Sequence, residues 1–121
     1  MEVKESFRDK LYNLNSLHNL SRGNKDFVIK MVNIFINQTT EIISKIKEAI
    51  ENEDFKTVSA MAHKLKPSVE GVGVLSILDE IRFLEKMSKE TNDKQQMKAL
   101  FDSIQLVLEE VIIQLKENEF S

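Results

Sequence analysis

Apolar residues recur at every third or fourth position through most of the chain, in four long runs separated by short polar breaks. This spacing matches the 3.6-residue period of an α-helix, so each run predicts an amphipathic helix with one buried face. The breaks are Glu51-Asn52-Glu53-Asp54, the turn marked by Gly71 and Gly73, and Thr91-Asn92-Asp93. The predicted buried faces consist of Phe27, Met31, Ile34, Phe35, Ile42, Ile46, Ala49 and Ile50; then Phe55, Val58, Met61, Ala62, Leu65, Val69 and Val72; then Leu75, Ile77, Leu78, Ile81, Leu84 and Met87; and finally Met97, Leu100, Phe101, Ile104, Val107, Leu108, Val111, Ile112 and Leu115.

A shorter helix, Ser16 to Arg22, is predicted ahead of these runs, because Asn15 is a good capping residue and Gly23 follows directly after the segment. Asn24 and Asp54 are predicted to cap the first two long helices in the same way.

Four long helices with short connections predict an all-α protein: an antiparallel up-down four-helix bundle with a short additional N-terminal helix. Residues 14–118 form this predicted bundle. Residues 1–13 show no steady apolar period, and we expect them to be a flexible leader.

The composition narrows the classes of protein further. Three glycines and one proline in 121 residues supply too few turns for an all-β fold. The absence of cysteine excludes disulfides and thiolate chemistry and agrees with a cytoplasmic location. A net charge of −3 argues against nucleic-acid binding. No apolar run approaches the roughly 20 residues of a membrane span, and the N-terminus lacks the apolar core of a signal peptide.

The chain contains few of the residue combinations that enzymes use for catalysis. The chain holds two histidines and has no glycine-rich phosphate loop, no H-E-x-x-H motif and no E-x-x-H pair. We therefore expect no metal site and no self-sufficient enzyme.

His63 is the exception, because of its place on the second long helix. At about 100° per residue it lies about 140° from Val58, well outside the buried stripe. Ser59 and Lys66 border the stripe, and Pro67 lies one turn beyond His63. On geometry alone this is an ordinary exposed histidine, although a neutral imidazole is a competent nucleophile.

The segment Ala62-His63-Lys64-Leu65-Lys66-Pro67-Ser68 resembles the core of the histidine-containing phosphotransfer (HPt) domain family, which reads A-H-x-L-K-G-S. Gly73 and the pair Leu84-Glu85 match the glycine and the Leu-Glu pair that follow in the family. Asp54, and the run Leu14 to Leu17 ahead of Gly23 and Phe27, extend the resemblance, which covers Leu11 to Leu115.

The resemblance implies a phosphorelay intermediate of a two-component system. His63 would accept a phosphoryl group from the aspartate of a response-regulator receiver domain and pass it to another receiver. Lys66, which matches the family's lysine, would stabilise the phosphoryl group through a charge-assisted bond. The receiver would supply Mg²⁺, so no cofactor is expected in this chain. We expect a monomer that acts alone or as part of a hybrid histidine kinase.

Three residues around His63 are expected to shape partner docking: Ser59, Lys56 and Pro67. Pro67 stands where the family usually has glycine, so its ring alters the rim of the site. Proline also lacks the N–H that would bond the His63 carbonyl, and we expect a kink or a water there.

Two other functions compete with this interpretation. A helical adaptor that binds receivers without carrying phosphate would have no need of both His63 and Lys66. The second competing function is that of the dimerisation helix of a histidine kinase, which has an H-E-L-R-T-P box. In this chain Lys64 replaces the acidic residue of that box, the proline comes one position early, and no ATP-binding module follows.

Overall fold

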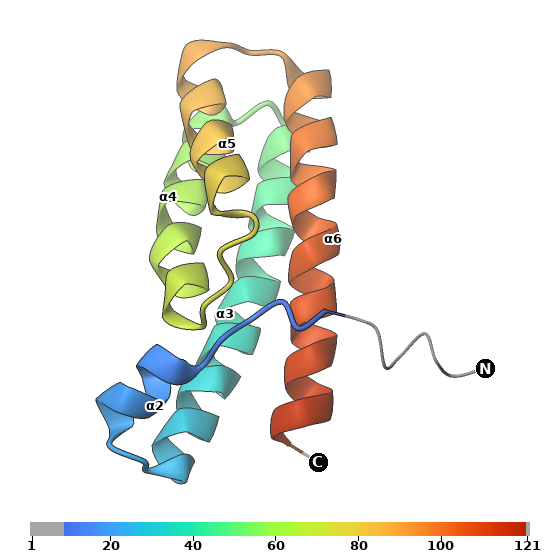
Figure 1. Ribbon diagram of the computed structural model, residues 1–121. Coiled ribbons are helices and arrows are strands. Elements are labelled where there is room, and N and C mark those ends of the chain that lie inside the picture. Colours follow the sequence, from blue (N-terminus) through green and yellow to red (C-terminus); the bar gives the residue numbers. More distant parts are fainter. Residues whose placement is uncertain (1–8, 121) are drawn as a thin grey trace, which may run out of the picture.

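The computed structural model describes residues 9–120, which form five helices and no strand (Figure 1). A short helix precedes four long helices that run alternately in opposite directions, so the predicted up-down bundle with an additional N-terminal helix is confirmed. Within residues 9–120, no helix is long and apolar enough to cross a membrane. The helices are α2 (Asn15–Ser21), α3 (Lys25–Glu51), α4 (Phe55–Gly71), α5 (Leu78–Glu90) and α6 (Lys94–Glu119).

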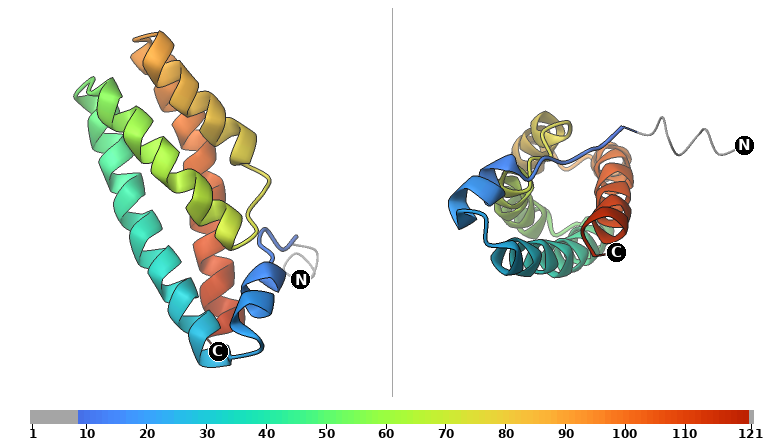
Figure 2. Two further views of the ribbon diagram at one scale, coloured as in Figure 1. Left: turned by 90° about the vertical axis from the view of Figure 1, so that its left-hand side faces the viewer. Right: turned by 60° about the horizontal axis from the view of Figure 1, so that its bottom comes forward.

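The four long helices form a ring in which α3 and α5 each contact both α4 and α6. Seen end-on, they surround one common core (Figure 2). Because α4 and α5 are shorter than α3 and α6, the N-terminal end of α3 extends past the end of α4. Helix α2 packs against α3 at that end.

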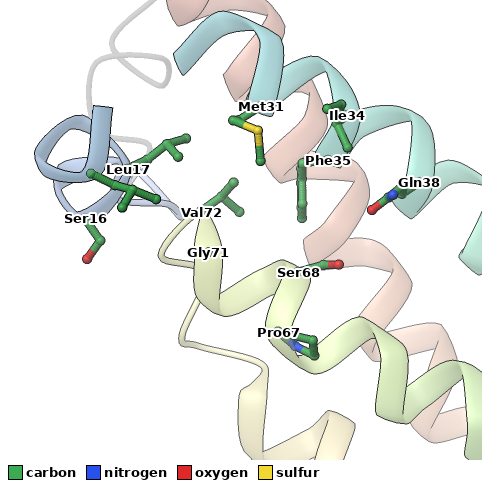
Figure 3. A pocket seen from close by; sticks show the side chains of 11 residues that line it. Ser16, Leu17, Met31, Ile34, Phe35, Gln38, Pro67, Ser68, Gly71 and Val72 are labelled. Atoms are coloured by element: carbon green, nitrogen blue, oxygen red, sulfur yellow. The ribbon is translucent and has the colours of Figure 1, made fainter. Parts of the chain in front are cut away.

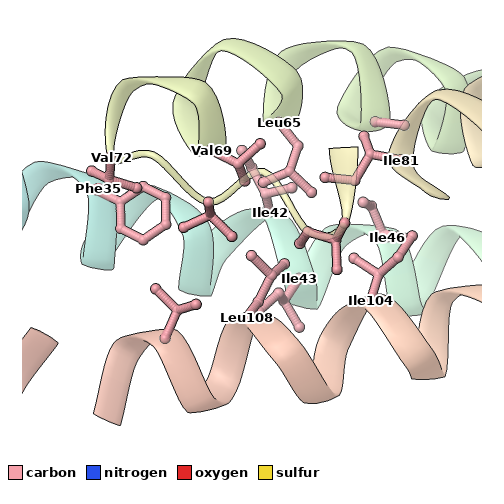
Figure 4. Close-up of a cluster of buried hydrophobic side chains, with 14 of the residues drawn as sticks. Phe35, Ile42, Ile43, Ile46, Leu65, Val69, Val72, Ile81, Ile104 and Leu108 are labelled. Carbon is pink, nitrogen blue, oxygen red and sulfur yellow. The ribbon is translucent and has the colours of Figure 1, made fainter. Parts of the chain in front are cut away.

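The core is built mostly from the predicted apolar faces (Figure 4). Leu65, Ile81 and Ile104, from three different helices, are fully buried, with 0% exposure. Two predicted core residues are exposed: Leu75 at 65% and Ile34 at 37%. Leu75 precedes α5, which begins only at Leu78, and Ile34 lies on the side of α3 that faces α2.

The predicted buried face is partly wrong in the first half of α3. Val28, Val32 and Ile36 are buried and were not predicted, whereas the predicted Phe27 and Met31 are only partly buried. The buried face of this segment is therefore turned by about one residue from the predicted one.

Two predicted helix caps are confirmed. The Asn24 side chain accepts a hydrogen bond from the Phe27 N–H at 3.1 Å. Asp54 accepts from the Thr57 N–H at 3.2 Å and from the Thr57 hydroxyl at 2.6 Å. These two bonds hold the pKa of Asp54 below its ordinary value. Each cap satisfies a backbone donor that the helix itself leaves free.

The cap predicted for α2 is wrong. Asn15 is the first residue of the helix rather than its cap, and its N–H donates to the side-chain oxygen of Asn13 at 2.8 Å. The cap position is occupied by Leu14, whose side chain makes no capping bond, and the helix begins one residue sooner than expected. At the other end, the helix stops at Ser21, one residue before the predicted end at Arg22. Arg22 and Gly23 both follow in the left-handed region, with φ of 54° and 83°, and a glycine adopts this backbone without strain.

The predicted leader, residues 1–13, falls partly outside the described residues, which begin at Asp9. Within the described part, Tyr12 belongs to the hydrophobic core and is only 3% exposed. Its hydroxyl donates to Glu119 at 2.7 Å. Burial, together with this bond, raises the pKa of Tyr12 to about 12. The packed part of the chain therefore begins before the predicted boundary at residue 14.

Residues 9–13 form a segment, here called the N-terminal strap, that crosses α6 (Figure 1). Gln114 of α6 is buried, and its side chain makes two hydrogen bonds to the strap backbone. Its oxygen accepts from the Leu11 N–H at 2.9 Å, and its amide donates to the Asp9 carbonyl at 2.8 Å. A buried amide needs such partners, so Gln114 fixes the strap in place.

The strap also contacts the turn between α4 and α5. The Asn13 N–H donates to the Val72 carbonyl at 3.0 Å. Gly73 has a φ of 67°, and a Cβ atom at this position would collide with the Asn13 carbonyl oxygen. Glycine is needed here both for its left-handed backbone and for the close approach of the strap.

We expect Gly73→Ala to lower the free energy of unfolding by at least about 2 kcal/mol, because it adds backbone strain and a clash with Asn13. Urea denaturation followed by circular dichroism would measure the loss. Gly71→Ala is the matched control: a Cβ at Gly71 meets nothing within 4 Å. That change should be neutral or stabilise by up to about 1 kcal/mol. Equal destabilisation by both changes would contradict the proposed packing of the strap.

Candidate functional site

His63 projects from the polar side of α4, and its side chain is 71% exposed. The neighbouring residues Ala62 and Leu65 have 0% exposure and anchor the same helix in the core. The predicted exposure of His63 is therefore confirmed, and a role as a buried core histidine is excluded.

A carboxylate from the adjacent helix contacts this imidazole. The Oε2 atom of Glu85, on α5, lies 3.0 Å from Nδ1 of His63. The Oε1 atom of the same carboxylate lies 2.7 Å from Nζ of Lys66, and Oε2 lies 3.6 Å from Nζ of Lys89. One carboxylate thus gathers three nitrogen groups from two helices, and these four residues are called the Glu85 cluster below.

Glu85 is ionised at neutral pH. The hydrogen bond from Lys66 is the largest cause that holds the pKa of Glu85 below its ordinary value of 4.5; partial burial opposes this effect, and the bond with His63 adds to it. Because the pKa of Glu85 is lowered in the folded protein, the cluster contributes to folding stability above about pH 4.5. This contribution is lost as the pH falls through the lowered pKa of Glu85.

The charge of Glu85 determines the tautomer of His63. An ionised carboxylate can only accept hydrogen bonds, so Nδ1 of His63 must be the donor. In a neutral imidazole only one nitrogen carries a proton, and Nε2 then keeps its lone pair. The site therefore presents a nucleophilic nitrogen on an exposed side chain.

The predicted docking residues lie on two sides of His63. Lys56 is exposed and Ser59 is half-buried, and together with Lys89 they line a groove of about 490 Å³ between α4 and α5. Pro67 is exposed and lines a different, largely apolar pocket of about 310 Å³ (Figure 3). The structure thus brings Lys66 to His63 through Glu85 and does not bring the docking residues into a single cavity.

The apolar pocket lies where α2, α3 and the C-terminal part of α4 meet (Figure 3). Helix α4 continues through Pro67 to Gly71. The pocket's apolar side chains include Leu20, which is 74% exposed, and Ile34. We call it the Pro67 pocket, and we call the other cavity the Lys56 groove. A partner that lies along α4 over His63 would meet both.

Sequence reasoning gave no role to two members of the cluster. Glu85 entered only as part of the Leu84-Glu85 resemblance, and Lys89 was not considered. The ion pair between Glu85 and Lys89 could have been predicted, because Lys89 follows Glu85 by four residues on one helix, a spacing typical of ion pairs. The contact of Glu85 with His63 crosses between helices, and no local spacing predicts it.

Residues 30–118 match the family model described as Hpt domain. The chain belongs to the Hpt domain family. Hpt domains serve histidine phosphotransfer in phosphorelay signalling and interact with response-regulator receiver domains, as carriers rather than catalysts. No curated protein and no solved structure matches the chain. The matched region begins within α3, so the strap and α2 precede it.

The part of this Hpt domain that the structure describes contains no group of three or more histidine, cysteine, aspartate or glutamate side chains arranged to hold a metal ion. The carboxylate of Glu85 contacts His63 and also pairs with Lys66 and Lys89.

We expect the neutral His63 side chain to carry its proton on Nδ1, and Glu85→Ala to move it towards Nε2 because the acceptor is lost. The ¹⁵N chemical shifts of the ring, measured where the imidazole is neutral, would report this change. Phosphoryl transfer to the variant should fall about tenfold, the scale of one charge-assisted hydrogen bond. Glu90→Ala on the same helix is the control and should change neither. A wild-type protein with its proton mainly on Nε2 would contradict this assignment.

Proposed function

We propose that this Hpt domain accepts a phosphoryl group on Nε2 of His63 from the aspartate of one receiver domain and passes it to the aspartate of another. The observation that carries the proposal is the bond between Glu85 and Nδ1 of His63. It leaves the lone pair on Nε2, and the side chain is 71% exposed to an incoming partner.

The transfer balances without any further reactant. The Nε2 lone pair attacks phosphorus, the bond from phosphorus to the aspartate oxygen breaks, and the aspartate leaves as a carboxylate. The phosphorylated imidazole keeps its proton on Nδ1 and becomes a cation. Its positive charge faces the carboxylate of Glu85 at 3.0 Å, so the structure that sets the tautomer also stabilises the product. Transfer to the second receiver reverses these steps.

Phosphoryl transfer mainly requires positioning and charge stabilisation. In this proposal the receiver supplies the aspartate and Mg²⁺, and this chain supplies the imidazole and binds no cofactor of its own. The protein acts in the cytoplasm as a monomer, alone or linked to a hybrid histidine kinase. It carries phosphate between partners and does not turn over a substrate by itself.

The receiver is proposed to dock along α4, over both cavities. The Pro67 pocket offers apolar surface on one side of His63. The Lys56 groove offers positive charge on the other side, where Lys56 can pair with acidic side chains of the receiver. Ser59 is small and leaves access to the imidazole. This arrangement also accounts for exposed apolar residues such as Leu20 at the pocket edge.

The central test uses a phosphorylated receiver domain and Mg²⁺. Wild-type protein should acquire one acid-labile, base-stable phosphoryl group, and His63→Gln should acquire none because the nucleophile is gone. Its free energy of unfolding should change by less than about 0.5 kcal/mol, since the side chain is exposed. Phosphate transfer would be followed by gel autoradiography and mass spectrometry.

His18→Gln, which changes the other histidine, is the control and should behave as wild type. Unchanged phosphate uptake by His63→Gln would refute the proposal. Binding of several receivers without any uptake by the wild type would favour the adaptor function instead.

Pro67→Gly should leave His63 phosphorylatable and change the transfer rate with a given receiver by less than about tenfold, because the ring lies at the rim and not at the nucleophile. Stopped-flow or rapid-quench kinetics would measure the rate. Pro67→Ala removes the same ring but keeps a good helix former. Similar rates for both variants would assign the effect to the ring. Complete loss of phosphorylation in either folded variant would show that Pro67 does more than shape the rim.

A further inference from the structure

We propose that Lys89 of α5 is the cation that binds the phosphoryl group on His63, whereas Lys66 acts on Glu85 and positions the imidazole through it. The resemblance to the HPt family had implied phosphoryl binding by Lys66. This inference rests on the proposed function and concerns the same site.

Lys66 is held by the carboxylate. Its Nζ lies 2.7 Å from Oε1 of Glu85, and its side chain is only 25% exposed. A short charge-assisted bond between two partly desolvated groups is costly to break. If Lys66 moved to a phosphoryl group, Glu85 would lose its closest positive partner while only 12% exposed. Lys66 therefore stays bound to Glu85 and keeps this carboxylate charged and oriented.

Lys89 is held much less tightly. Its Nζ lies 3.6 Å from Oε2 of Glu85, beyond ordinary hydrogen-bonding distance, and its side chain is 62% exposed. An exposed pair of this kind contributes little stability, so the ammonium group can leave the carboxylate at low cost.

Lys89 is also close to the reacting imidazole. Its Nζ and the Nδ1 atom of His63 both lie within 3.6 Å of the same oxygen, Oε2 of Glu85. Lys89 further lines the Lys56 groove with Ser59, which precedes His63 by one helical turn. A long, exposed lysine side chain at this place can turn from Glu85 towards an anion on the imidazole.

The charges of the cluster support this assignment. Before transfer, one carboxylate faces two lysines, which leaves one positive charge in excess. A phosphoryl group brings a charge of about −1.5 to −2 at neutral pH. Because Lys66 is needed by Glu85, the excess charge that can meet the phosphoryl group is that of Lys89.

The test uses the full chain loaded with phosphoramidate, a small donor that needs no receiver. The phosphoramidate P–N bond breaks, ammonia leaves, and phosphorus bonds to Nε2 of His63. A ³¹P NMR titration then gives the pKa of the bound phosphoryl group. A nearby cation lowers that pKa, whereas a change that only loosens the fold does not.

Lys89→Met should raise the pKa of the phosphoryl group, with about threefold tighter proton binding, the scale of one exposed ion pair. Lys89→Arg should restore the wild-type value. Lys66→Met should leave this pKa nearly unchanged but shift the ¹⁵N resonance of Nδ1, because Glu85 is released. Lys64→Met removes another exposed cation, which follows His63 directly on α4, and it should change neither measurement.

A raised phosphoryl pKa in Lys66→Met together with an unchanged value in Lys89→Met would overturn the assignment. This outcome is compatible with normal transfer from receivers, so it would leave the proposed function intact. Conversely, loading by phosphoramidate with the expected Lys89 effect, but no transfer from any receiver, would refute the proposed function alone. Failure of every donor to phosphorylate the wild type would overturn both.

Discussion

The contact between α4 and α5 determines the geometry of the His63 site, because the imidazole lies on one helix and its carboxylate partner on the other. Glu85 reaches His63 only if the two helices keep their relative register. That register depends on buried residues next to the site: Ala62 and Leu65 on α4, Ile81 and Leu84 on α5. Each has 0% exposure, so a slip of one helix along the other would open cavities in the core. The hydrophobic core thus sets the geometry of a site that lies on the surface.

Features that depend on one helix at a time were predictable from the sequence. The buried faces of α4 and α6 and the exposure of His63 follow from the periodicity of a single segment, and the caps at Asn24 and Asp54 follow from residue type. Features that depend on two distant segments were not. Gln114 and Leu11 are 103 residues apart, and no local pattern shows that this amide holds the strap. The role of Glu85 remained hidden for the same reason, although the pair Leu84-Glu85 was recognised.

The cluster also shows that a lysine that matches a family pattern can have its closest charged partner on another helix. Lys66 follows His63 by three residues, so the sequence places it near the imidazole. Only the structure shows that its ammonium group is directed to Glu85 at 2.7 Å. Sequence spacing predicts which side chains are neighbours, but the partner of a flexible side chain depends on charges supplied by another helix.

The position of Tyr12 has a consequence for spectroscopy. The chain contains one tyrosine and no tryptophan, so its near-ultraviolet fluorescence comes almost entirely from this residue. Tyr12 lies in the strap, buried against the core and bonded to Glu119, and not beside His63. Its emission therefore reports whether the N-terminal segment is seated on α6, and it provides an optical signal of that docking without any added label.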